Sequence, residues 1–212
     1  MTHTKASIYL VDENAETRCA LHGVLASEGL DVTPFSSPAD FLANFKLTHD
    51  CCLILDLLAP GKSGEQLIQQ LQEWQVSIPI IAITACTDVP GALRAIRIGV
   101  LDVCPKPVHL HVLLPLIHHA LAVGAVHERY CQQVKAARDL LAGLTSRERQ
   151  LFDLVVLGQT YKEMGATMGI SPRTIEHHRS HMARKLGMDR VAELVRLDIT
   201  AADGSLTTSM SD

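Results

Sequence analysis

The chain has 212 residues, of which 47% are hydrophobic and 20% are charged, and it contains six cysteines. This length allows one large domain or two small ones, and the composition is ordinary for a soluble globular protein. The cysteines form no CxxC pair, which argues against zinc or disulfide chemistry, and the first apolar run is too short for a signal peptide or a membrane span. We therefore expect a cytoplasmic protein with no membrane partner.

The formal net charge of −4 conceals two halves of opposite character. Residues 1–123 carry 7 Lys and Arg against 12 Asp and Glu, whereas residues 124–199 carry 12 against 9. An acidic first half and a basic second half suggest separate tasks, with a polyanion as the partner of the second.

Short apolar runs alternate with helical patterns through the first 122 residues. Five βα units of this length predict a doubly wound parallel sheet with helices on both faces. The strands are predicted near 7–11, 31–35, 51–56, 79–84 and 101–104, and the helices near 14–28, 38–46, 64–74, 89–98 and 109–122.

The remainder of the chain reads as helical. Residues 123–143 have few turn signals, and we interpret them as a helical linker in preference to a specific coiled-coil dimer. Residues 144–199 predict an all-α domain of four short helices, and residues 200–212 predict a disordered tail. The capping signals behind this prediction are Thr145 with Glu148, Thr160 with Glu163, Ser171 before Pro172, Gly187 as a stop, and Asp189 as the cap of the fourth helix.

Polar side chains follow four of the five predicted strands, where a parallel sheet binds its ligands. They are Asp12, Glu13, Asp56, Thr84 and Lys106. A carboxylate can attack phosphorus if the charge on the equatorial oxygens is neutralised. The three acids could hold Mg²⁺, which prefers carboxylates with waters and phosphate oxygens, while Lys106 supplies a positive charge and Thr84 a hydroxyl donor.

These positions resemble the receiver domain of bacterial two-component response regulators, a flavodoxin-like α/β fold, over residues 1–122. The matching segments are Val11-Asp12-Glu13, Leu55-Asp56 with Pro60 and Ser63-Gly64, Thr84-Ala85, and Gly99 and Asp102 with Lys106-Pro107. The resemblance implies that Asp56 accepts a phosphoryl group from a sensor histidine kinase. It also implies that Asp12, Glu13, Asp56 and the backbone carbonyl of Leu58 bind Mg²⁺, with Thr84 as the switch hydroxyl and Lys106 as the cation.

Three positions depart from the usual receiver pattern. Glu13 stands where an aspartate is commoner, Ala59 replaces a methionine, and Val103 occupies the position of an aromatic residue that rotates inward with the switch hydroxyl. An alternative therefore stays open, in which a degenerate receiver serves only for dimerisation of a constitutive DNA-binding regulator.

The predicted helices 161–168 and 172–186 form a helix-turn-helix. In the second helix Ile175, Met182 and Leu186 share one face, while Glu176, His177, Ser180 and Arg184 lie on the outward side. Such a helix fits the major groove of B-DNA. The plainer alternative is a solvated, charged face on a small helical bundle.

The second half resembles the LuxR-type DNA-binding domain, and the matching segments are Leu144-Thr145, Arg147-Glu148-Arg149, Gly158, Lys162-Glu163-Met164, Ile170-Ser171-Pro172-Arg173-Thr174-Ile175-Glu176, His178-Arg179 and Lys185-Leu186. With the receiver, nearly the whole chain resembles a response regulator of the FixJ/NarL class. The resemblance implies a non-enzymatic transcription regulator that binds double-stranded DNA, with phosphorylation promoting a homodimer. Glu176, His177 and Ser180 are the candidates for base reading, and Lys162, Arg173, Arg179 and Lys185 for phosphate contacts, with Thr174 and Arg184 also in the expected DNA-binding set. Tyr161 replaces an asparagine that is common in the family.

Overall fold

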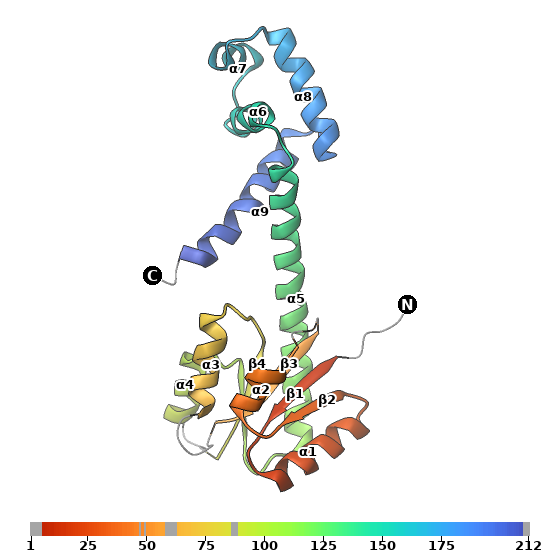
Figure 1. The fold of residues 1–212 in the computed structure, drawn as a ribbon, viewed down its shortest axis with the longest axis vertical. Helices are drawn as coiled ribbons and strands as arrows, with labels where there is room; N and C mark the ends of the chain where they lie inside the picture. The colour runs from red at the N-terminus through yellow and green to blue at the C-terminus, as the bar shows by residue number, and fades with distance from the viewer. Residues whose placement is uncertain (1–5, 47, 49, 58–62, 86–88, 210–212) are drawn as a thin grey trace. The chain divides into compact units, whose positions relative to one another are not determined.

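The computed structural model describes residues 6–46, 48, 50–57, 63–85 and 89–209. The chain divides into two compact units, residues 1–128 and residues 129–212. Figure 1 shows the sheet of the first unit and the helices of the second. Each unit is described by itself below.

The first unit is built on a five-stranded parallel sheet with the strand order β2-β1-β3-β4-β5. This is the flavodoxin-like order, and it confirms the predicted doubly wound fold. The strands are β1 Ser7–Val11, β2 Asp31–Phe35, β3 Cys51–Asp56, β4 Ile80–Thr84 and β5 Asp102–Pro105, and the helices are α1 Ala15–Ser27, α2 Pro38–Asn44, α3 Ser63–Glu73, α4 Val89–Arg97 and α5 Leu110–Ala142.

Side chains alternate between two apolar cores because successive residues of a strand point to opposite faces of the sheet. On β3, Leu53 and Leu55 join the core formed with α2, α3 and α4, whereas Cys52 and Ile54 join the core formed with α1 and α5. Helices lie on both faces of the sheet in Figure 1. Burial on both faces explains why the strands read as continuous apolar runs in the sequence.

Helix α5 extends far beyond the predicted 109–122 segment. It continues without a break to Ala142, so residues 123–142 are helical, as expected of the predicted linker, and they are continuous with the helix predicted over 109–122. Leu113 and Ile117 belong to the core of the first unit, and Ala137 and Leu141 to the core of the second. Within the described residues, α5 is the one helix that is long and apolar enough to cross a membrane. Core helices of soluble proteins can have the same length and composition.

In the described part of the second unit, residues 129–209, four further helices surround a separate core. They are α6 Ser146–Val156, α7 Tyr161–Met168, α8 Pro172–Leu186 and α9 Val191–Ser209. Both predicted capping boxes are present, Ser171 caps α8, and Gly169 and Gly187 end α7 and α8 with φ of 69° and 68°. Left-handed backbone at these two positions suits glycine, which has no Cβ to clash.

Two predictions for the last helix are wrong. Arg190, and not Asp189, is the residue directly before α9, and the Glu193 carboxylate accepts a hydrogen bond from the Arg190 N–H at 3.3 Å. The helix also continues to Ser209, where the composition predicts a disordered tail from residue 200. Tertiary packing overrides composition here, because Ala201 packs against the core and its carbonyl accepts a hydrogen bond from Arg138 Nε at 3.1 Å.

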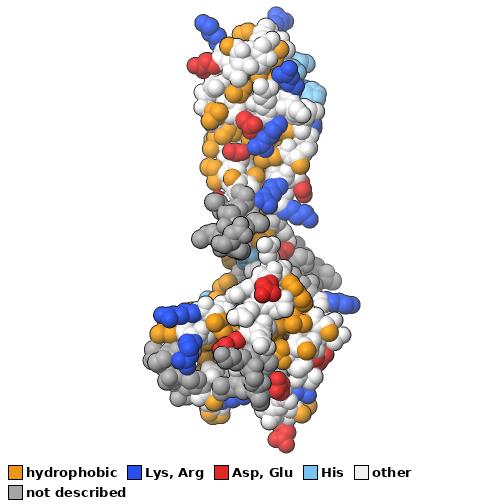
Figure 2. All heavy atoms as spheres, turned by 60° about the vertical axis from the view of Figure 1, so that its left-hand side comes forward, with side chains coloured by type: hydrophobic (Ala, Val, Ile, Leu, Met, Phe, Trp, Pro, Cys, Tyr) orange, Lys and Arg blue, Asp and Glu red, His pale blue; other side chains and the backbone are white. Residues whose placement is uncertain are grey.

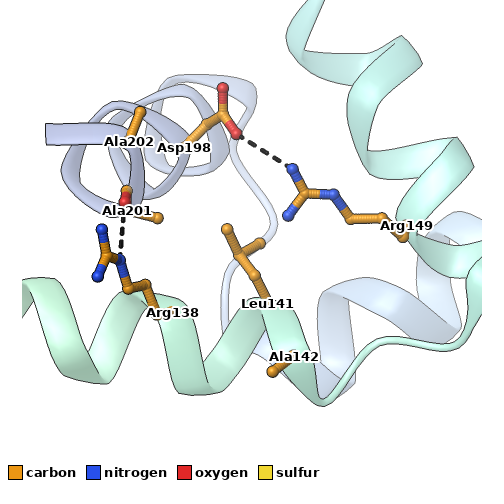
Figure 3. A pocket seen from close by; sticks show the side chains of 7 residues that line it. All are labelled: Arg138, Leu141, Ala142, Arg149, Asp198, Ala201 and Ala202. Atoms are coloured by element: carbon orange, nitrogen blue, oxygen red, sulfur yellow. Dashed lines mark hydrogen bonds and ion pairs between the residues drawn. The ribbon is translucent and has the colours of Figure 1, made fainter. Parts of the chain in front are cut away.

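Figure 3 shows how α5, α6 and α9 meet around a pocket of about 370 Å³. Arg138 of α5 reaches the backbone of α9, and Arg149 of α6 lies 3.7 Å from a carboxylate oxygen of Asp198 on α9. The lower wall is Leu141, which belongs to the core. The contacts join α9 to the rest of the second unit.

Candidate phosphoryl-acceptor and nucleic-acid sites

Four of the predicted site residues gather at the carboxyl ends of the strands. Asp56 and Thr84 are the last residues of β3 and β4, and Asp12 and Lys106 directly follow β1 and β5. A backbone hydrogen bond of 2.8 Å from the Lys106 N–H to the Thr84 carbonyl fixes the end of β5 beside β4. Because all strands are parallel, these side chains share one edge of the sheet.

An ion pair joins the two central groups of this edge. Lys106 Nζ lies 2.6 Å from Asp56 Oδ2, and the two side chains are 31% and 11% exposed. The following Lys106–Pro107 peptide is cis. The contact places the positive charge of the Lys106 ammonium directly beside the Asp56 carboxylate.

Asp12 is the most buried acid of the site, at 1% exposure. Its Oδ1 accepts a hydrogen bond from the Asn14 N–H at 2.8 Å, while Oδ2 has no hydrogen-bond partner among the described residues. The pKa of Asp12 is raised, mainly because the carboxyl group is buried and also because the negative charge of Asp56 is close. The hydrogen bond from the Asn14 N–H opposes this increase. A buried carboxylate oxygen without a donor, beside a second carboxylate, favours a bound cation.

Glu13 does not complete a three-acid cluster. Its side chain is exposed, and within the described residues no group of three or more His, Cys, Asp or Glu side chains could hold a metal ion. The structure therefore brings Asp12 and Asp56 together without Glu13. Leu58, whose carbonyl is the fourth predicted ligand, lies outside the described residues, as do Ala59 and Pro60.

Two further positions at this end of the sheet have defined places. Thr84 is buried, with 4% of its surface exposed. Val103, which stands in place of the usual aromatic residue, is partly buried and packs against the core on the side of α3 and α4.

The exposed face of α8 has the predicted arrangement. Ile175, Met182 and Leu186 are buried, while Glu176, His177, Ser180 and Arg184 are exposed. Figure 2 shows Lys, Arg and His side chains on the surface of the second unit. Two hydroxyls of the set bond within the helix, since Ser180 Oγ donates to the Glu176 carbonyl at 3.1 Å and Thr174 Oγ1 lies 2.8 Å from Ser171 Oγ.

The predicted phosphate-binding cations fall into two groups. Lys162 and Arg173 are exposed. Arg179 donates hydrogen bonds to the Tyr161 hydroxyl and to the Asp189 carbonyl, and Lys185 Nζ lies 2.9 Å from Glu148 Oε2. Arg179 therefore links α8 to α7, and Lys185 links α8 to α6.

The sequence predicts the capping role of Glu148 but not its contacts with α8. Beyond its capping bonds to Thr145, its carboxylate accepts from Lys185 and lies 3.4 Å from His181 Nδ1. The Thr145 N–H and the Lys185 ammonium lower the pKa of Glu148 to about 2. The capping box predicted its place at the start of α6, but no local pattern indicates a partner 37 residues away.

The fold and its two candidate sites define a two-domain protein: an α/β domain with two aspartates and a lysine at the carboxyl ends of its strands, followed by a helix-turn-helix domain. Comparison with protein-family models agrees: residues 8–118 match the response regulator receiver domain, and residues 142–197 match the LuxR family of bacterial regulatory proteins. The receiver match covers more than half of the chain.

Individual relatives align along nearly the entire length. The transcriptional regulatory protein TdiR of Thauera aromatica is 35% identical over 195 residues, which cover 92% of this chain and 86% of TdiR. FixJ of Bradyrhizobium diazoefficiens is 34% identical over 200 residues, covering 93% and 97%. The structure of the response regulator StyR superposes with a TM-score of 0.80 at 32% identity, covering 92% of this chain and 98% of StyR.

The chain thus belongs to the response regulators of the FixJ/NarL class, and it is a two-component transcriptional regulator. The family is one of transcription regulators and not of enzymes. Its receiver domain implies a phosphodonor kinase, and its LuxR-type domain implies a DNA partner.

Proposed function

We propose that Asp56 accepts a phosphoryl group from a phosphohistidine of a sensor histidine kinase, and that α8 conveys the signal to double-stranded DNA. The observation that carries this proposal is the 2.6 Å ion pair between Lys106 and Asp56 beside buried Asp12. An ammonium at this position meets the negative charge of an incoming phosphoryl group.

The transfer requires no residue beyond those at the sheet edge. A carboxylate oxygen of Asp56 forms a bond to phosphorus as the P–N bond of the phosphohistidine breaks, and the imidazole leaves with that electron pair and takes up a proton. Lys106 offsets the charge on the phosphoryl oxygens, and the Thr84 hydroxyl donates a hydrogen bond to one of them. The product is an aspartyl phosphate.

The acids of the site fit Mg²⁺. This ion commonly binds through one or two carboxylates and keeps waters and phosphate oxygens as its other ligands, so Asp12 and Asp56 suffice without a third acid. The unpartnered Asp12 Oδ2 supports this assignment. When bound, Mg²⁺ neutralises charge on the transferring group; Glu13 and the Leu58 carbonyl are the other proposed ligands, the former through water because its side chain is exposed.

The proposed DNA binding is supported by the exposed polar and charged residues of α8. Glu176, His177 and Ser180 occupy the outward face of α8 and are the proposed base-reading residues. Phosphorylation adds about two negative charges near Thr84 and Lys106, which we infer promotes a homodimer that binds two DNA half-sites. We further propose that the protein works in the cytoplasm without a membrane partner and has no catalytic turnover of its own.

Intact mass measurement after incubation with a small phosphodonor and magnesium tests this function. We expect a gain of one phosphoryl group in the natural chain and in Asp31→Asn, which alters an exposed carboxylate at the opposite, amino end of β2. The gain should be absent in Asp56→Asn. DNA binding that is equal for phosphorylated protein, untreated protein and Asp56→Asn would instead support a constitutive regulator.

A further inference from the structure

A tyrosine and an arginine from different helices form a close pair at the helix-turn-helix. Tyr161 is the first residue of α7, and Arg179 lies in the middle of α8. Arg179 Nη1 donates a hydrogen bond to the Tyr161 hydroxyl at 2.5 Å, and the guanidinium carbon lies 5.4 Å from the centre of the tyrosine ring. A second nitrogen donates to the Asp189 carbonyl at 3.4 Å.

The pair retains hydrogen-bonding capacity that these contacts do not use. A guanidinium has five N–H donors, and the two hydrogen bonds of Arg179 leave three of them available. The Tyr161 oxygen acts as an acceptor toward Arg179, so its own O–H proton still needs an acceptor. Accepting from a cation polarises the hydroxyl and makes it a stronger donor.

The surroundings of the pair favour an anion as that acceptor. The tyrosine is 37% exposed and stands in the first turn of α7, where the helix dipole adds positive potential. Exposed Lys162 follows it directly. Glu163, the acid of the same turn, is turned back to Thr160, whose N–H and hydroxyl both donate to its Oε2 at 2.7 Å.

We infer that Tyr161 is a positioning residue for Arg179, and that the two side chains together bind one phosphate of the DNA backbone. The ring and hydroxyl of Tyr161 hold the guanidinium in place, and the phenolic O–H and a remaining guanidinium N–H donate to phosphate oxygens. The inference rests on the proposed function, in which this unit binds DNA. It assigns a task to the tyrosine at a position where the family commonly has an asparagine.

A double-mutant cycle on the full chain tests this assignment. The affinity for a mixed-sequence DNA duplex of about 30 base pairs, long enough for two half-sites, is measured by fluorescence anisotropy over a series of salt concentrations. The variants are Tyr161→Phe, which keeps the ring and removes the hydroxyl, Arg179→Ala, and the double variant. Tyr130→Phe on α5 is the matched control for loss of a phenolic hydroxyl elsewhere in the second unit.

We expect Tyr161→Phe to weaken binding by about three- to tenfold, the effect of one hydrogen bond, with Tyr130→Phe unchanged. Arg179→Ala should weaken binding further and reduce the salt slope by about one, as expected for one lost phosphate contact. In the Arg179→Ala background, Tyr161→Phe should cost less than about twofold.

Two results would overturn the inference: natural affinity in Tyr161→Phe, or an undiminished loss when the same change is made in Arg179→Ala. A merely structural tie between α7 and α8 would lower the unfolding temperature of Tyr161→Phe and leave its affinity and salt slope unchanged, which also overturns it. Failure of the proposed function is distinct, because then the natural chain itself shows no salt-dependent DNA binding and Lys162→Ala makes no difference.

Discussion

Glu148→Gln is the substitution whose effect follows most directly from the structure. The Glu148 carboxylate is buried at the start of α6 and joins this helix to Lys185 and His181 on α8. Glutamine has nearly the same shape and keeps a carbonyl oxygen for the Thr145 N–H. The substitution therefore removes the charge while it preserves most of the packing.

The magnitude follows from the pKa of this carboxyl group. Hydrogen bonds lower the pKa of Glu148 from 4.5 to about 2, a difference that corresponds to ~3 kcal/mol at most. Lys185 and His181 are 40% and 61% exposed, and solvent screening weakens such contacts. With the retained Thr145 bond, we expect a loss of about 1–2 kcal/mol at neutral pH, or roughly 5–15 °C in the unfolding temperature of a unit of this size.

The pH dependence has a definite sign. Because the folded pKa lies below the ordinary value, the stabilisation by Glu148 is complete above pH 4.5 and is lost as the pH falls toward about 2. Scanning calorimetry of the full chain between about pH 7 and pH 3 should show the difference between natural protein and Glu148→Gln shrinking over that range. Glu176→Gln, on the exposed face of α8, is the control. A difference that stays constant down to pH 3 would refute the reasoning.

Two other substitutions or reagents probe the packing. A Cβ at Gly165 would lie 2.7 Å from the Ile170 carbonyl oxygen, so Gly165→Ala should lower the free energy of unfolding in urea by about 1–3 kcal/mol. At an open helical site the same substitution would raise it by about 1 kcal/mol, so increased stability would contradict the close approach. Burial raises the pKa of Cys52 to about 12, so a thiol reagent followed by peptide mass spectrometry should modify exposed Cys19 at once and Cys52 only after unfolding. Equal rates would show that β3 opens readily.

Most of the fold was predictable because its signals are local. The strand 51–56 was predicted to the residue, since a strand buried on both faces is a continuous apolar run. The capping boxes at Thr145 and Thr160 were also predicted, because each needs only residues three positions apart. By contrast, the hydrogen bond from Arg138 to the Ala201 carbonyl ties α9 to α5 across 63 residues of sequence, and composition does not reveal such a contact.

In the candidate sites, too, local features could be predicted from the sequence and tertiary contacts could not. Residues at strand ends share an edge in any parallel sheet, so the meeting of Asp12, Asp56 and Lys106 could be predicted from their positions alone. The exposure of Glu13 could not, because it depends on how the chain turns away after β1. Pairs across helices, such as Arg179 with Tyr161, depend on tertiary packing and leave no periodic signal.

Lys185 illustrates how such a pair changes a functional assignment. By sequence it is one of the cations for DNA phosphate, yet its ammonium lies 2.9 Å from a carboxylate with only 9% of its side chain exposed. Moving Lys185 to a phosphate would remove the ammonium nearest to Glu148 and leave the buried carboxylate with Thr145 and His181, and loss of the opposite charge from a buried group is costly. Lys162 and Arg173 are exposed and form no ion pair within the described residues, so they can bind phosphate at no such cost. We therefore expect Lys162 and Arg173 to contact phosphates alongside Arg179, while Lys185 holds α8 to α6.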